Sequence, residues 1–169
     1  MNKSNLKSYA PQARKDFIAA VTARANLLGL SETAGTLEVA SAQTQGDVTV
    51  IAGQAWPAKV SGQRDKLIER IRKDGFAQTM EAVAYTWFNR FAALRYMELH
   101  ELLDHGHRVL SSRDGGLPEL LRYAADVNLP GLQAARVHEL QLAGNQDNQL
   151  YKLLLVAQCN ELSRTMPFL

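Results

Sequence analysis

Basic residues are concentrated between residues 59 and 74, and they are the clearest candidates for a chemical role. This segment, KVSGQRDKLIERIRKD, carries six basic and three acidic residues. Clustered lysine and arginine can contact the phosphates of duplex DNA, an interaction that does not depend on base sequence. The alternative is an ordinary solvated helix face, on which Asp65 and Glu69 pair with neighbouring cations. The candidates for DNA-backbone contact are Arg64, Lys66, Arg70, Arg72 and Lys73.

A second polar set stands in an otherwise apolar stretch further along the chain. It consists of Asn89, Arg90, Arg95 and Glu98. Arg95 and Glu98 are three residues apart, so on a helix their side chains are neighbours. We predict that the set forms a structural polar network that satisfies its own charges. The alternative is an edge from which the two arginines reach a phosphate or a partner protein.

The histidines offer a weaker possibility, a metal site. His100, Asp104, His105 and His107 lie close together in sequence, and imidazole and carboxylate are common metal ligands. Their spacing matches no established metal-binding motif. Gly106 is explained as a helix stop, with His105 well placed at the negative end of the helix dipole. We therefore expect no metal here, and we expect the single cysteine, Cys159, to be a buried and inert thiol.

A long helix over about 79–104 is expected to position these residues. The stretch contains no proline or glycine, and its apolar residues recur at spacings of three and four. They form two adjoining stripes, which predicts a central helix buried on several sides. One stripe is Met80, Val83, Ala84, Trp87, Phe91 and Leu94; the other is Phe88, Ala92, Tyr96, Leu99 and Leu103.

The rest of the chain predicts a mainly α protein, a bundle of five or six helices around that central helix. Further helices are expected over 11–28, 119–127, 132–143 and 147–162, and Leu67, Ile68 and Ile71 predict another of about three turns that ends before Gly75; prolines stand at several starts and glycines at several ends. The Ser-, Thr- and Gln-rich segment 31–47 is expected to be a flexible loop. A small β-hairpin is expected near 47–56, where Val48, Val50 and Ile51 favour a strand.

Length and composition fit one globular domain over 1–169, and the length would also allow a domain with a small appendage. The net charge of +2 does not by itself indicate a nucleic-acid binder, but the positive charge lies mostly in the first half of the chain. No stretch is long and apolar enough to cross a bilayer, and the first residues do not resemble a signal peptide. We therefore expect a cytoplasmic protein that does not interact with a membrane.

The string AYTWFNRFAALRYMELHELLDHGHRVLSS resembles the N-terminal region of the PglX family, the adenine-specific DNA methyltransferases of BREX phage-defence systems. The resemblance continues through DGGLPELLRYAADVNLPGL and LAGNQDNQLYKLLLVAQCNELSRTMPFL. Upstream, YAPQARKDF and KVSGQRDKLIERIRKDGFAQTMEA are similar too, so the resemblance spans most of the chain.

The resemblance implies a whole enzyme that transfers a methyl group from S-adenosylmethionine to adenine N6. Such enzymes hold a flipped-out base in a pocket with an Asn-Pro-Pro-Tyr type motif. This chain has five prolines and no two are adjacent, and Gly115-Gly116 follows no strand that would suit a methyl-donor loop. We therefore expect this chain to bind no cofactor and to be non-catalytic by itself.

The resulting hypothesis is a helical N-terminal module that braces a downstream methyltransferase domain and helps to bind the backbone of double-stranded DNA. The end of the chain, MPFL, favours this view because its Phe168 and Leu169 lack the polar tail of a natural terminus. One alternative is a module that docks other BREX subunits. Another is a free-standing helical regulator.

Overall fold

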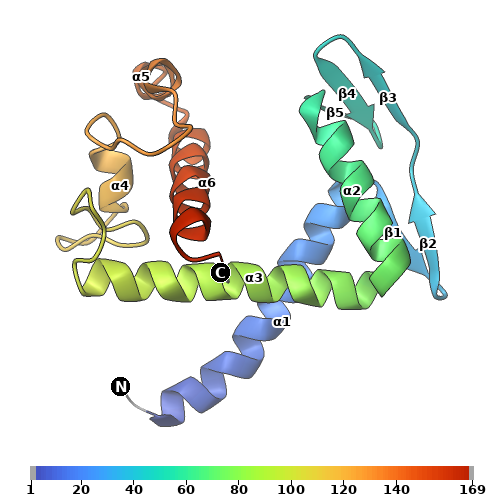
Figure 1. Cartoon of the computed structure of the whole chain (residues 1–169), viewed down its shortest axis with the longest axis horizontal. Coiled ribbons are helices and arrows are strands. Elements are labelled where there is room, and N and C mark those ends of the chain that lie inside the picture. Colours follow the sequence, from blue (N-terminus) through green and yellow to red (C-terminus); the bar gives the residue numbers. More distant parts are fainter. Residues whose placement is uncertain (1–2, 168–169) are drawn as a thin grey trace. The chain divides into compact units, whose positions relative to one another are not determined.

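The computed structural model describes the backbone of residues 3–167 and the side chains of residues 9–167. Within this range the chain is mainly helical with small antiparallel β elements, which confirms the predicted class (Figure 1). Phe168 and Leu169, on which the expectation about the chain end depended, lie outside the described residues. Contacts divide the chain into two compact units, residues 1–88 and residues 89–169, and not into the single domain that was predicted. We call them the first unit and the second unit.

The first unit begins with α1 (Lys3–Leu27), which starts eight residues before the predicted start at Pro11. Pro11 lies inside the helix. A proline lacks the backbone N–H and so removes one hydrogen bond of the helix, but here the helix continues on both sides of it. The predicted start at Pro11 was therefore wrong, because it assumed that the proline stood in the first turn. The end before Gly29 was predicted to within one residue.

Five short strands follow α1, and the prediction of a flexible loop over 31–47 was wrong. The strands β1 (Leu30–Thr33) and β2 (Thr36–Val39) form one hairpin, and β3 (Ala42–Gln45) pairs with β4 (Val48–Ile51). The predicted hairpin is formed by β4 and β5 (Gln54–Pro57), which complete a sheet of order β3-β4-β5. All four residues of β3 are exposed. Because backbone pairing rather than apolar alternation holds this strand, the sequence carried no periodic signal for it.

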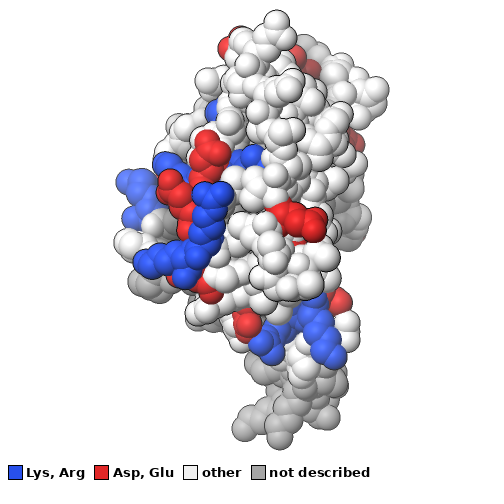
Figure 2. Space-filling view, turned by 90° about the vertical axis from the view of Figure 1, so that its right-hand side faces the viewer, with Lys and Arg blue, Asp and Glu red and all other residues white. Residues whose placement is uncertain are grey.

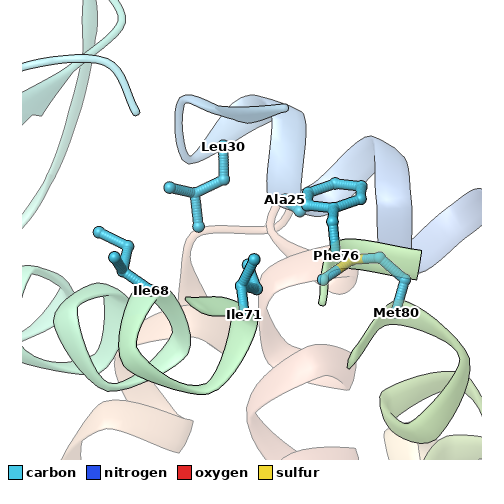
Figure 3. Close-up of a cluster of buried hydrophobic side chains, with 6 residues drawn as sticks. All are labelled: Ala25, Leu30, Ile68, Ile71, Phe76 and Met80. Carbon is cyan, nitrogen blue, oxygen red and sulfur yellow. The ribbon is translucent and has the colours of Figure 1, made fainter. Parts of the chain in front are cut away.

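Two helices complete the first unit. As predicted, α2 (Lys59–Asp74) ends at Gly75, whose φ of 88° is unfavourable for other residues and whose N–H donates to the Ile71 carbonyl at 2.8 Å. The next helix, α3 (Phe76–Leu99), contributes residues to both units. The core of the first unit is drawn from α1, β1, α2 and the start of α3 (Figure 3), and its buried members are Ala25, Leu30, Ile68, Ile71, Phe76 and Met80.

The helix α3 ends at Leu99, five residues before its predicted end. Glu101 adopts a left-handed φ of 56°, and the N–H of Leu102 reaches back to the Met97 carbonyl at 2.9 Å. A left-handed residue at a helix end is usually glycine, so the glutamate at position 101 did not indicate the end of the helix in the sequence. The helix is also less buried than predicted, because Tyr96 and Leu99 are about half exposed.

In the part of the chain that the structure describes, no helix combines the length and the apolar character needed to cross a membrane.

The second unit contains the remainder of α3 and three further helices. These are α4 (Glu119–Arg122), α5 (Ala134–Leu142) and α6 (Asp147–Thr165). The predicted helix 119–127 is only one turn long, and residues 123–126 continue as turns. Leu94, Leu120, Leu154 and Leu162 are almost completely buried. A long irregular segment, residues 100–118, connects α3 to α4 within this unit.

Candidate nucleic-acid interface

The helix α2 has a core face and a cationic face. Ile68 and Ile71 are buried, while Lys66, Arg70 and Lys73 are exposed. The three cations are spaced i, i+4 and i+7, so they lie on one face of the helix in successive turns. Because the opposite face is fixed in the core, these cations are presented from a rigid element. We call them the α2 cationic face.

Acidic residues accompany this face. Arg70 lies 3.6 Å from Asp74, whereas Lys66, Arg72 and Lys73 have no carboxylate within 4.0 Å among the described residues. Figure 2 views the molecule from the right-hand side of Figure 1 and shows Lys and Arg interleaved with Asp and Glu. The local charge is therefore mixed, and the cations most available to an external anion are Lys66 and Lys73.

Arg72 also lies on this helix, but it does not share the direction of Arg70. Residues two apart on a helix point to different sides. Arg72 is exposed and could contact an anion only at the flank of the α2 cationic face.

Arg64 differs from the other predicted DNA-contact residues because only 5% of it is exposed. Its Nε donates to the Leu28 carbonyl at 2.7 Å, and its Nη2 donates to the Ala40 carbonyl at 2.5 Å. Leu28 directly follows α1, where helix carbonyls lack partners within the helix and a cation is favourable. Arg64 therefore ties α1 to the strands. The structure removes it from the set of residues available to DNA.

The junction that Arg64 holds is tight. Gly29 has a φ of 65°, and its carbonyl accepts from the Ala40 N–H at 2.8 Å. A Cβ placed on Gly29 would lie 2.6 Å from the Ala40 Cβ, closer than real Cβ contacts. Both the backbone conformation and the close approach thus require glycine.

In the second unit, the structure brings together two members of the predicted polar network. Arg95 Nη1 lies 2.5 Å from Glu98 Oε1, and Glu98 is 2% exposed. The carboxylate also accepts from the Leu110 N–H at 2.7 Å and from the Ser111 hydroxyl at 2.9 Å. Glu98 thus connects α3 to the irregular segment 100–118, while Asn89 is exposed and Arg90 is half-buried. For Arg95 and Glu98, the geometry supports the structural interpretation.

A second buried carboxylate, Glu119, was not among the predicted site residues. It accepts from the N–H groups of Arg108 and Arg113, at 2.9 and 2.8 Å, and from Arg113 Nη1 at 2.7 Å. Burial by itself would raise the pKa of Glu119, but these hydrogen bonds and the guanidinium outweigh it and hold the pKa below its ordinary value. The available sequence signal was its place after Pro118, because an acidic residue is favourable in the first turn of a helix.

His105 and His107 lie in the irregular segment 100–118 that follows α3. Among the described residues, no group of three or more His, Cys, Asp or Glu side chains could hold a metal ion. His105 Nδ1 accepts from the His107 N–H at 3.1 Å, so the proton of the neutral ring is on Nε2, 2.9 Å from Gln158 Oε1. Burial lowers the pKa of His105, although the Gln158 hydrogen bond opposes this effect.

Cys159 is buried, as predicted. Burial raises the pKa of its thiol, and the nearby positive charge of Arg90 opposes this only in part. A thiol with a raised pKa is a poor nucleophile at neutral pH, so Cys159 is a packing residue.

Comparison with known proteins shows that the chain is similar to adenine-specific methyltransferases. No family model matches the sequence. The chain is similar along its whole length to the N-terminal region of adenine-specific methyltransferases. One relative is the adenine-specific methyltransferase BrxX of Escherichia coli O9:H4 (strain HS), 45% identical over 175 residues that cover 100% of this chain and 14% of BrxX.

A second relative is the adenine-specific methyltransferase PglX of Lacticaseibacillus casei (strain Zhang). It is 28% identical over 183 residues, which cover 99% of this chain and 15% of PglX. The chain thus spans about one seventh of the length of these two relatives. The predicted resemblance to the N-terminal region of PglX methyltransferases is confirmed.

Proposed function

We propose that this chain is the non-catalytic N-terminal helical module of a BREX-type, site-specific DNA adenine-N6 methyltransferase. The proposal is supported by the similarity of the whole chain to the N-terminal region of two adenine-specific methyltransferases. The full enzyme would use S-adenosylmethionine to mark host DNA during phage defence. Flipping the adenine and binding the methyl donor are assigned to the polypeptide beyond this module.

The work of the module itself is to brace the catalytic domain and to attract the DNA backbone through the α2 cationic face. The observation that carries the DNA role is the position of Lys66 and Lys73, exposed on one helix face without a carboxylate within 4.0 Å in the described part of the chain. The buried Ile68 and Ile71 anchor the opposite face. Lysine contacts to phosphate position an enzyme on the duplex without selecting a base sequence, so site recognition belongs elsewhere in the enzyme.

The test is a double charge reversal, Lys66→Glu with Lys73→Glu, in the full-length enzyme. Each lost phosphate contact lowers the slope of log K against log salt by about 0.9, so we expect the slope to fall by about 2. Binding to duplex DNA is measured by fluorescence anisotropy over a salt series. The matched control is Arg122→Glu with Lys152→Glu, which changes the net charge equally on exposed residues of the second unit. If the slope fell equally in both double variants, the effect would follow from net charge, and the proposal that the α2 cationic face contacts the DNA backbone would be wrong.

A second candidate function is docking of another BREX subunit on the same face. The interleaving of Asp65 and Glu69 with the cations favours it, because a protein partner can complement both signs and a phosphate backbone cannot. Under this function the double reversal leaves DNA binding unchanged and abolishes co-purification of a BREX subunit with the full-length enzyme. The two measurements therefore separate the two candidates.

A further inference from the structure

The first unit contains an apolar groove between α1 and the first half of α3. The groove has a volume of about 420 Å³, which lies in the range of protein sites that receive a ligand or a set of partner side chains. Its lining includes Arg14, Phe17, Ile18, Glu81, Tyr85 and Phe88.

The floor of the groove is a fixed aromatic contact. Phe17 of α1 meets Phe88 of α3 edge to face, with ring centroids 5.8 Å apart and ring planes at 86°. This is a favourable arrangement for two aromatic rings. Ala84, also in the lining, is 3% exposed, so its small side chain leaves open the space above it. The floor is therefore preformed and offers no hydrogen-bonding side chain.

The charges of the groove lie at its mouth and satisfy each other. Arg14 and Glu81 form an ion pair from α1 to α3, and their side chains are 54% and 38% exposed. The hydrogen bond from Arg14 to Glu81 raises the pKa of Arg14 further above its ordinary value. Since the pair is internally neutral, the groove has no net attraction for a cation or an anion.

These features exclude the small molecules that such an enzyme uses. S-adenosylmethionine and a flipped nucleotide both carry charged and hydrogen-bonding groups, and burying these without partners is unfavourable. Beyond the Arg14–Glu81 pair, the side chains of the lining supply only the Tyr85 hydroxyl. The chemistry of the groove fits uncharged, apolar side chains of a protein segment.

We infer that this groove seats an apolar segment of the methyltransferase polypeptide outside this chain. The inference rests on the proposed function, that the chain is the N-terminal module of such an enzyme. The two relatives are about seven times as long as the region they share with this chain. In an enzyme of that length, most of the polypeptide that could fill the groove lies outside this chain. Binding of such a segment in the groove would give the proposed bracing role a defined place in the first unit.

The test is photo-cross-linking in the full-length enzyme. The photoreactive residue p-benzoylphenylalanine is placed at Tyr85, which is 50% exposed at the groove, and in a matched control at Ala19, an exposed α1 residue outside the lining. The enzyme is a mixture of ¹⁴N- and ¹⁵N-labelled copies, and cross-linked peptides are identified by mass spectrometry. A third enzyme combines the Tyr85 probe with Ala10→Trp, which fills the groove from an exposed position in its lining.

We expect the Tyr85 probe to capture a peptide from beyond residue 169 within the same isotopic copy. We expect this product to be absent with the Ala19 probe and lost with Ala10→Trp. Capture of peptides within residues 1–169 only, capture of another isotopic copy, or no capture would each overturn the inference. The intact mass of the purified enzyme tests separately whether further polypeptide follows the module. The readout contains no DNA, so failure of the DNA-binding role leaves it unaffected.

Discussion

The two units both bury charge, but they bury opposite charges against opposite backbone groups. In the first unit, Arg64 donates to the carbonyls of Leu28 and Ala40. In the second unit, Glu98 and Glu119 accept from the N–H groups of Leu110, Arg108 and Arg113. Each charged side chain lies where regular structure ends and backbone groups would otherwise be buried without partners.

The difference shows that the unpaired backbone group selects the sign of the buried charge. The end of α1 leaves carbonyls, which require a donor, whereas the irregular segment 100–118 leaves N–H groups, which require an acceptor. Charge content along a helix therefore does not identify a binding face. Arg64 and Arg70 are both basic residues of α2, yet one holds the fold and the other is exposed to solvent.

The first prediction sharpens this contrast within α2. Arg64→Ala should lower the free energy of unfolding of the first unit by about 3 kcal/mol. The carbonyls of Leu28 and Ala40 lose their charged donor, and the buried Arg64 side chain no longer fills its space. Arg70→Ala should change it by less than about 0.5 kcal/mol, since its pair with Asp74 is exposed. Urea unfolding followed by tryptophan fluorescence reports on this unit, because Trp56 and Trp87 both lie in it. Equal effects of the two changes would contradict the division of roles.

The sequence predicted those elements whose side chains carry the signal. Apolar periodicity and a terminal glycine located α2, and the valines and Ile51 of β4 located its hairpin with β5. The pairing of Arg95 with Glu98 followed from helical spacing alone. Each of these features depends on residues close together in the chain.

The missed features depend on residues distant in sequence or on unusual backbone geometry. The strand β3 is held by backbone pairing, and α3 ends through a left-handed glutamate where glycine would have been recognisable. Arg64 reaches a carbonyl 36 residues away, a contact invisible to local pattern, so its burial could not be separated from the exposure of its neighbours. For the same reason, the groove between α1 and α3 could not be derived from either helix by itself.

The second prediction uses acid to separate the two units. The folded-state pKa of Glu119 lies below its ordinary value of 4.5, so its stabilisation is present above that value and is lost as the pH falls through the folded pKa. Hydrogen–deuterium exchange between pH 7 and pH 3, corrected for intrinsic rates, should show residues 100–118 losing protection first.

Glu119→Gln tests the source of this acid sensitivity. The variant should lose about 2 kcal/mol at neutral pH, because the amide cannot accept from all the donors around it. It should also lose part of the pH dependence of the second unit, since position 119 no longer titrates. If residues 24–40 of the first unit lost protection at the same pH, or if the variant kept the full acid sensitivity, the proposed contrast between the units would fail.

The smallest expected effect is the free energy of unfolding that a cation contributes when the buried carboxylate beside it already accepts hydrogen bonds from other groups. Arg95 is about half exposed, and Glu98 keeps the Leu110 N–H and the Ser111 hydroxyl when Arg95 is removed. Arg95→Ala should therefore cost about 1 kcal/mol, well below the 3–5 kcal/mol typical of breaking a fully buried pair. The matched control, Arg136→Ala, removes an i,i+3 pair with Glu139 in which both side chains are exposed, and should cost about 0.3 kcal/mol. Unfolding is followed by far-ultraviolet circular dichroism. A loss above about 3 kcal/mol for Arg95→Ala would mean that the ion pair, and not the backbone N–H, stabilises the buried Glu98.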